Sequence, residues 1–297
     1  MIGIDSALAE WKDSRQFMPN VPGQFVKRTS SWRTVAPLVW AGPSDPTIYG
    51  IIDVEVSKAL IFLERRGLET GTKLTLTHLV TRAVAVALRR HPECNAYVRW
   101  GRIYQRRDVD VFVLVARPPS ASDGERDQRA DLSGVRLPCA DTLSVEEIAA
   151  ELRCQVARLR TGEDRAIGPL KNAMGTFPSS LARLGLQIVT LLQYGFNLDL
   201  SRFGVPRDTF GGAIVSSMGM FGIRYGFAPL VPAMRLSCLL GVGRVEDRAI
   251  VVDGNIVIRP ILPITATLDH RIIDGYQAGR LAATLTALLS DPEGNGL

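Results

Sequence analysis

The sequence predicts a mixed α/β protein in which amphipathic helices pack on a sheet. Residues 109–116 are almost continuously apolar, which is typical of a strand buried on both faces. Residues 74–90 carry apolar side chains in one helical stripe that ends before Pro92. Residues 264–289 join an alternating strand to a helix with leucines at helical spacing. With 297 residues, 46% of them hydrophobic, the chain can bury a sizeable core.

The other elements follow in chain order. Ser57 is a candidate cap for a helix that ends at Gly67, and Ser144 with Glu147 has the spacing of a capping box for a helix reaching about Arg160. The composition of residues 117–129 indicates an exposed loop. Asp253-Gly254-Asn255 predicts a hairpin turn. Further strands are predicted at residues 48–56, 97–104, 213–215, 236–245 and 249–252, the last two joined around 246–248.

Two segments stand apart from this pattern. Residues 1–46 contain five prolines and short apolar runs, so we expect an N-terminal arm that wraps around the rest. Within a section at about 165–209, residues 181–196 are helical in pattern but apolar over much of the circumference. Such a helix is expected to be buried against the same subunit or a neighbour. Membrane contact is the weaker alternative, because the stretch has one basic residue.

The amino-acid composition disfavours several classes of function. The formal charge of +5 comes mainly from arginines interspersed with acids, which favours a solvated surface over a nucleic-acid site. Cys94, Cys139, Cys154 and Cys238 are isolated, so they indicate small core residues rather than disulfides or a metal site. The sequence shows no signal-peptide pattern and no apolar run of about 20 residues. We expect a cytoplasmic protein without a metal.

The strongest candidate for catalysis is His270, at the end of the strand 264–269. An imidazole with a pKa of about 6.5 both takes and returns a proton near neutral pH. Asp274-Gly275, four residues later, predicts a turn before the helix that carries Leu281, Leu285, Leu288 and Leu289. His78 and His91 lie in or at the end of a helix and are expected to be structural or solvent-facing.

These residues carry a resemblance. Asp269-His270 followed by Asp274-Gly275 resembles the His-x-x-x-Asp-Gly signature of the catalytic domain of dihydrolipoamide acyltransferases, the core subunits of 2-oxo acid dehydrogenase complexes. Chloramphenicol acetyltransferase carries a related signature. Four further motifs match in the same order: His91-Pro92-Glu93-Cys94-Asn95-Ala96, Gly219-Met220-Phe221-Gly222, Leu239-Leu240-Gly241-Val242-Gly243-Arg244 and Val251-Val252-Asp253-Gly254.

The resemblance implies a fold and an activity. The fold would be a chloramphenicol acetyltransferase-like mixed-sheet sandwich with helices packed on the sheet, trimeric, over residues 47–297. His270 would take the proton from a thiol of coenzyme A or dihydrolipoamide, so that the thiolate attacks an acyl thioester. Ser216, with Ser217 as the second choice, would stabilise the oxyanion. Asp274 would hold the loop through hydrogen bonds or an arginine partner.

The family also implies partners. Active sites would lie between subunits, so His270 and Ser216 would come from different chains, and trimers would build larger cages. The sequence departs from the family in having no lipoyl domain and no subunit-binding domain, and the section at about 165–209 has no counterpart in the usual core. A lipoyl group would then be supplied in trans, or another thiol, amine or alcohol would be the acceptor. Two alternatives stay open: a non-catalytic trimeric or cage-forming scaffold, and an assembly protein attached to a membrane through residues 181–196.

Overall fold

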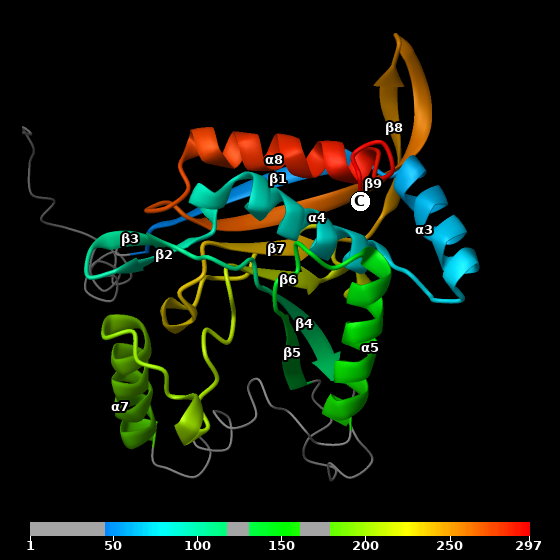
Figure 1. The fold of residues 1–297 in the computed structure, drawn as a ribbon. Coiled ribbons are helices and arrows are strands. Elements are labelled where there is room, and N and C mark those ends of the chain that lie inside the picture. The colour runs from blue at the N-terminus through cyan, green and yellow to red at the C-terminus, as the bar shows by residue number, and fades with distance from the viewer. Residues whose placement is uncertain (1–44, 118–130, 161–178) are drawn as a thin grey trace, which may run out of the picture. The chain divides into compact units, whose positions relative to one another are not determined.

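A mixed seven-stranded sheet forms the centre of the fold (Figure 1). The computed structural model describes residues 45–117, 131–160 and 179–297. Six strands follow the spatial order β1-β9-β7-β6-β4-β5, and β8 pairs with β9 off this path. Their bounds are β1 (Thr47–Glu55), β4 (Val111–Arg117), β5 (Asp131–Leu137), β6 (Ala213–Ser217), β7 (Cys238–Val242), β8 (Glu246–Val252) and β9 (Asn255–Asp269). The mixed α/β class predicted from the sequence is confirmed.

The 15-residue strand β9 links the parts of this sheet. Its C-terminal part pairs antiparallel with β1 on one side and β7 on the other, so that Thr265 lies opposite both Ile51 and Gly241. Its N-terminal part pairs with β8 through a turn in which Asp253 and Gly254 both have positive φ, as a two-residue hairpin requires. The alternation around residue 265 therefore belongs to one long strand that ends immediately before His270.

Parallel pairing occurs only at the middle of the described sheet, between β4 and β6 and between β6 and β7. The side chains of Val111, Phe112 and Val113 are buried, as are those of Ala213–Val215. These two strands therefore need apolar residues on both faces, which explains the continuous apolar run seen in the sequence.

Helices cover one face of the sheet and form the main core. Apolar side chains of α4, α5 and α8 pack there with Val54, Val113 and Val215 from the strands. Figure 1 shows α4 and α8 running along the sheet and α5 beside β4 and β5. The four helices of this layer are α3 (Ser57–Thr70), α4 (Leu76–Arg90), α5 (Val145–Arg160) and α8 (Gly275–Ser290).

The helix ends agree only in part with the sequence. Ser144 and Glu147 form the predicted capping box at the start of α5. Ser57 is wrong as a cap: it is the first residue of α3, and its N–H donates to Glu55 Oε1 at 2.8 Å. The helix also runs through Gly67 and ends at Thr70, and its C-cap is Gly71, whose φ of 63° only glycine adopts easily.

The opposite face of the sheet carries a second, smaller core. Phe112, Ile214, Leu236 and Leu239 pack there with partly buried residues such as Phe210. Much of its cover comes from residues 218–236, which contain two short 3₁₀ turns, η4 (Gly219–Phe221) and η5 (Pro232–Met234). A Cβ at Gly219 would lie 2.5 Å from the carbonyl oxygen of Gly243, so glycine is needed for this close approach.

The section at about 165–209 is described from residue 179. It contains α7 (Ser179–Thr190), a π-helical turn η2 (Leu191–Gly195) and a 3₁₀ turn η3 (Ser201–Phe203). The helix is therefore confirmed. Leu184 and Ile188 of its apolar stripe are exposed in the single chain, whereas Leu186, Val189 and Leu192 are partly buried. The helix is therefore only partly buried on its own subunit.

Several other expectations need correction. Residues 97–104 are a hairpin of β2 (Ala96–Arg99) and β3 (Arg102–Gln105), because Trp100 and Gly101 take positive φ between them. Glu246–Arg248 belong to β8, which pairs with β9 and does not continue β7. The expected loop at 117–129 falls, apart from Arg117 in β4, outside the described residues, as does the arm at 1–46 up to residue 44. Of the cysteines, Cys139 and Cys154 are exposed, while Cys94 and Cys238 are buried.

Candidate active site

His270 lies on the short connection between β9 and α8. Its backbone N–H donates to the carbonyl oxygen of Pro46 at 2.8 Å, which fixes the loop to the start of β1. The N–H groups of Ile272 and Ile273 donate to the carbonyl oxygen of Asp269, so the loop folds back in one tight turn. The ring of His270 is on an exposed residue, while Ile272 and Ile273 are buried beneath it. A rigid loop thus presents this imidazole to solvent.

The hydrogen bond of the ring determines its tautomer. Nδ1 of His270 lies 3.2 Å from the carbonyl oxygen of Ile273. A carbonyl oxygen only accepts hydrogen bonds, so Nδ1 carries the hydrogen and donates it. In the neutral ring Nε2 is then left with a free lone pair. This is the arrangement that a general base needs.

Two carboxylates shape the same loop. Asp269 is buried and accepts hydrogen bonds from Arg271 through both of its oxygens, at 2.9 and 2.6 Å. Asp274 accepts from the N–H groups of Tyr276 and Gln277, while Gln277 Oε1 accepts from the N–H of Asp274. Asp274 is therefore the N-cap of α8, in a capping box. The predicted turn at Asp274-Gly275 is wrong, because Gly275 is the first helical residue, but a loop-holding role for Asp274 agrees with these bonds.

Ser216 and Ser217 lie at the end of β6 and point to opposite faces of the sheet. Ser216 shares the face of Ile214 and stands between Leu114 and Gly241 on the neighbouring strands. It is half-buried, and its hydroxyl forms no hydrogen bond with another described residue. Ser217 shares the helix-covered face of Ala213 and Val215.

Within one chain, Ser216 and His270 lie too far apart to act together. Ser216 is opposite Gly241, which is opposite Thr265 of β9. His270 comes five residues after Thr265, which is about 17 Å along an extended strand at the usual rise per residue. Two strand spacings, together about 10 Å, separate the strands β6 and β9. A site that uses both side chains therefore needs a second copy of the chain.

The other titratable candidates are structural. Nδ1 of His78 accepts from the N–H of Thr75 in the capping box of α4, and Nε2 of His91 lies 2.7 Å from the hydroxyl of Thr284. The expectation that these two histidines are structural or solvent-facing is confirmed. Burial raises the pKa of the Cys94 thiol to about 11 and that of Cys238 to about 12. Neither thiol forms the thiolate near neutral pH, so neither is a nucleophile.

A surface hollow of about 290 Å³ lies between α3 and the residues after α8, and includes Lys58 and Asp291. This hollow is at the other end of α8 from His270. An ion pair of 2.7 Å joins Lys58 to Asp291. In the described ranges, His, Cys, Asp and Glu side chains form no group suited to a metal ion. No helix within those ranges is both long and apolar enough to cross a membrane.

Sequence reasoning located His270 but missed what orients its ring. The carbonyl groups of Ile273 and Pro46 belong to the backbone, so the residue types in the sequence do not indicate these contacts. Ile273 gives only one signal in the sequence, its apolar side chain in a loop, and the structure shows this side chain to be fully buried. A buried anchor three residues after a histidine suggests a tight turn, but does not say which ring nitrogen the turn will contact.

The chain matches the sequence model of a known family. Residues 34–166 and 205–297 match the 2-oxoacid dehydrogenases acyltransferase (catalytic domain) family, which is most of the chain. The chain belongs to this family. The resemblance read from the His270 loop is therefore confirmed. This acyltransferase match omits residues 167–204, which include α7 and η2.

The chain is also similar to curated acyltransferases. The chain is 26% identical over 281 residues to the dihydrolipoyllysine-residue acetyltransferase component of the pyruvate dehydrogenase complex of Zymomonas mobilis, covering 93% of the chain and 52% of the relative. It is 24% identical over 222 residues to the succinyltransferase component of the 2-oxoglutarate dehydrogenase complex of Haemophilus influenzae, covering 75% and 42%. The chain thus spans about half, or less, of the length of these relatives.

Solved acyltransferase structures have the same fold. The crystal structure of Azotobacter vinelandii dihydrolipoamide acetyltransferase superimposes with a TM-score of 0.61 at 21% identity, covering 95% of this chain and 97% of that one. The cubic core of a pyruvate dehydrogenase multienzyme complex gives a TM-score of 0.62 at 20% identity with the same coverage. These likenesses confirm the expected mixed sheet with helices packed on it.

Proposed function

We propose that this protein is an acyltransferase that moves an acyl group between coenzyme A and a thiol acceptor similar to dihydrolipoamide, with His270 as the general base. The observation that carries the proposal is the Nδ1–H to Ile273 hydrogen bond on an exposed residue, which leaves Nε2 free to accept a proton. The names of the curated relatives, dihydrolipoyllysine acyltransferases, supply the substrate class.

The reaction follows from the pKa of a thiol. A thiol with a pKa of about 8.5 is mostly protonated at neutral pH, whereas the thiolate is the nucleophile. Nε2 of His270 takes the thiol proton, and the thiolate attacks the carbonyl carbon of the acyl thioester. The carbonyl oxygen becomes an oxyanion that accepts a hydrogen bond from the Ser216 hydroxyl. Collapse of this intermediate breaks the original C–S bond, and the leaving thiolate regains the proton from the imidazolium.

A trimer with active sites between subunits is part of the proposal. The separation of Ser216 and His270 along the register supports it, because one chain cannot bring the two side chains to one thioester. Asp274 would act as a positioning residue by holding the start of α8. A lipoyl group carried by another protein would then reach the site from solution. We also propose a cytoplasmic location, which cell fractionation would test.

The proposal is tested by measuring acyl transfer with a panel of acyl-coenzyme A donors and thiol acceptors, including a free lipoylated domain, by mass spectrometry. His270→Ala should lower kcat by about 10³-fold or more, because the proton acceptor is lost. Ser216→Ala should lower it by about 10²- to 10³-fold. Tyr276→Phe, an exposed change beside the same loop, is the matched control and should leave the rate unchanged. Full activity in both of the first two variants would refute the assignment, and a protein inactive with every donor would favour the scaffold alternative.

A further inference from the structure

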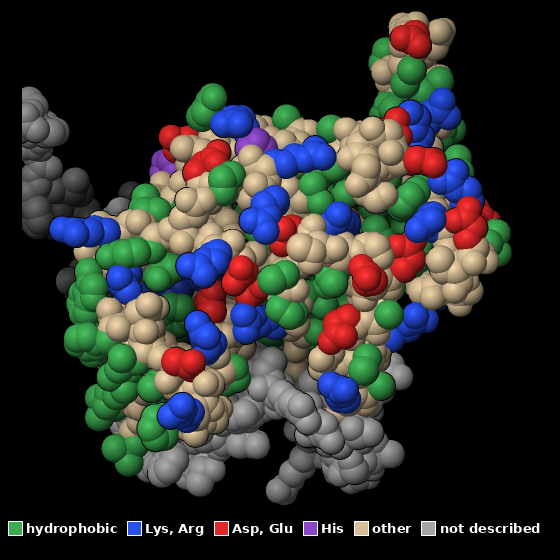
Figure 2. Space-filling view, viewed as in Figure 1, with side chains coloured by type: hydrophobic (Ala, Val, Ile, Leu, Met, Phe, Trp, Pro, Cys, Tyr) green, Lys and Arg blue, Asp and Glu red, His purple; other side chains and the backbone are tan. Residues whose placement is uncertain are grey.

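An exposed apolar surface lies mostly on the part of the chain that the family model does not match. We call it the insertion face and define it by Leu184, Ile188, Leu191, Phe196 and Phe203, together with Trp100 of the β2–β3 hairpin. Leu184, Ile188 and Leu191 recur at helical spacing, so they form one stripe. Trp100 is 64% and Phe203 81% exposed. Figure 2 shows hydrophobic side chains gathered over α7 and the β2–β3 hairpin, with basic side chains around them.

Contacts between the two segments make this surface continuous. Nε1 of Trp100 donates to the carbonyl oxygen of Gly195 at 2.8 Å. The rings of Trp100 and Phe196 meet edge to face, with centroids 6.1 Å apart. A Cβ at Gly195 would lie 2.9 Å from Leu191 and 3.1 Å from the Trp100 ring, so the glycine allows this close approach. The insertion and the hairpin therefore present one apolar surface.

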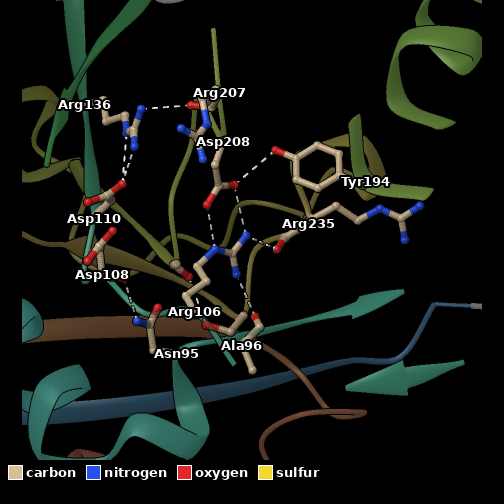
Figure 3. A network of polar contacts seen from close by, with 12 residues as sticks. Asn95, Ala96, Arg106, Asp108, Asp110, Arg136, Tyr194, Arg207, Asp208 and Arg235 are labelled. Atoms are coloured by element: carbon tan, nitrogen blue, oxygen red, sulfur yellow. Dashed lines mark hydrogen bonds and ion pairs between the residues drawn. The ribbon is translucent and has the colours of Figure 1, made fainter. Parts of the chain in front are cut away.

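A buried polar network holds the insertion face in place (Figure 3). Arg106, whose side chain is 6% exposed, donates to both oxygens of Asp208 and to the carbonyl oxygens of Ala96 and Arg235. The hydroxyl of Tyr194 donates to the same carboxylate at 3.2 Å. Because these bonds tie η2 to the hairpin, the exposed apolar residues belong to a fixed surface.

The insertion face is surrounded by positive charge. Residues 96–107 and 195–208 contain six arginines and two aspartates. Their net charge is therefore +4, compared with +5 for the whole chain. Both aspartates are already paired, Asp208 with Arg106 and Asp199 with Arg207. Among the described residues, no carboxylate forms an ion pair with Arg99, Arg102 or Arg202. The free charge around the apolar surface is therefore cationic.

An apolar surface surrounded by arginines favours an anionic lipid surface over a second copy of the chain as its partner. A second copy that met this face through a two-fold axis would bring the same arginines against each other, and like charges at an interface are repulsive. A surface of anionic lipids complements both properties. Tryptophan and phenylalanine insert at the interfacial level, and each nearby arginine adds attraction of about 1 kcal/mol to an anionic membrane. The net positive charge could not be seen from residues 181–196 alone, because the arginines come from the hairpin and from residue 202.

We propose that the insertion face docks on the surface of a membrane that contains anionic phospholipids, without crossing it. The hydrophobic stripe of α7 would lie in the plane of the interface, with Trp100 and Phe203 inserted and Arg102 and Arg202 at the headgroups. The proposal does not depend on the acyltransferase activity, since it rests on residues outside the family match or on the β2–β3 hairpin.

The test is co-sedimentation of the full-length protein with vesicles of phosphatidylcholine alone or of phosphatidylcholine mixed with phosphatidylglycerol. The protein should pellet with the mixed vesicles, and raised salt should weaken binding. Leu184→Glu with Ile188→Glu should lower the partition coefficient at least about tenfold, and Arg102→Gln with Arg202→Gln should lower it on anionic vesicles only. Leu68→Glu, at an 80% exposed leucine on α3, is the matched control and should bind as the parent does.

A second measurement reports on the depth of insertion. Trp11, Trp32 and Trp40 are changed to phenylalanine, so that Trp100 is the remaining tryptophan. Its fluorescence should be quenched by brominated lipids in the mixed vesicles. Parent protein that stays in the supernatant, or double-glutamate protein that pellets like the parent, would overturn the proposal. So would a smaller mass by light scattering for the double-glutamate variant without lipid, because the face would then be a contact between copies.

Discussion

His78 is the third residue of α4, and its ring is partly buried against the start of that helix. Nδ1 accepts a hydrogen bond from the N–H of Thr75 at 3.2 Å, which is possible only while this nitrogen has no hydrogen. Burial, helped by the charge of Arg153, lowers the pKa of His78 to about 4. The folded protein therefore keeps this histidine neutral, whereas the unfolded chain protonates it at about pH 6.5.

We predict a pH-dependent loss of stability from this residue. Between pH 6.5 and 4 the unfolded chain binds a proton that the folded chain does not, so the free energy of unfolding falls as the pH falls through this window. Above pH 6.5 the contribution is fully present. Urea unfolding of the parent and of His78→Gln, measured across this range, should give a difference that changes by about 1–3 kcal/mol. A constant difference between the two proteins would contradict the prediction.

At the residue scale, the sequence predicts the positions of the site residues but not their hydrogen bonds. His270 follows from its place after an alternating strand, and Asp274 from its place before a leucine-rich helix. The ring of His270 bonds to a backbone carbonyl, and Asp274 bonds to backbone N–H groups. Every residue type carries such groups, so the sequence contains no specific signal for either contact.

At the element scale, the carboxylate of Asp208 is one of the groups that attach the insertion to the core. Burial acts to raise the pKa of Asp208, but hydrogen bonds and charge from Arg106 outweigh it, so the pKa lies below its usual value. The side chain of Asp208 is 33% exposed, while that of Arg106 is 6% exposed. Removing the carboxylate charge would therefore leave a buried guanidinium without its partner.

We predict that Asp208→Asn lowers the free energy of unfolding by about 2–3 kcal/mol, at the low end for a broken buried pair because Asp208 is partly exposed. Limited proteolysis should cut within residues 179–209 faster than in the parent. The matched control is Arg207→Gln, which breaks an exposed pair of 3.7 Å with Asp199 and should cost no more than about 0.5 kcal/mol. Equal stability of the two variants would show that the network does not hold the insertion.

Elements with strong periodicity are predicted well, whereas strand β5 is missed. The stripe of α4 and the apolar runs of β4 and β6 match the structure. Strand β5 is not predicted because Gly134 interrupts its pattern. The glycine is needed there, since a Cβ would collide with the ring of Phe112. The exposure of α7 also has no sequence signal, because an apolar stripe looks the same whether or not a partner covers it.

At the scale of the whole molecule, the register separates the two proposed catalytic side chains. If sites form between chains, a His270→Ala subunit still provides Ser216, and a Ser216→Ala subunit still provides His270. We predict that the two inactive proteins, unfolded together and refolded at equal amounts, recover about a quarter of the parent activity, since random assembly pairs the intact residues at that frequency. Each variant refolded alone is the control and should recover no activity beyond its own residual rate. No recovery in a mixture shown to contain hybrid oligomers would contradict shared sites.

The ribbon formed by β8 and the first part of β9 projects beyond the helices (Figure 1). Val251, Ile256 and Ile258 are exposed on it, and a two-stranded ribbon alone is only marginally stable in water. The ribbon would therefore open before the rest of the sheet and offer an extended apolar segment to chaperones and proteases. If the proposed oligomer covers this ribbon, subunits made in excess would be recognised and removed in the cell, and only complete assemblies would persist.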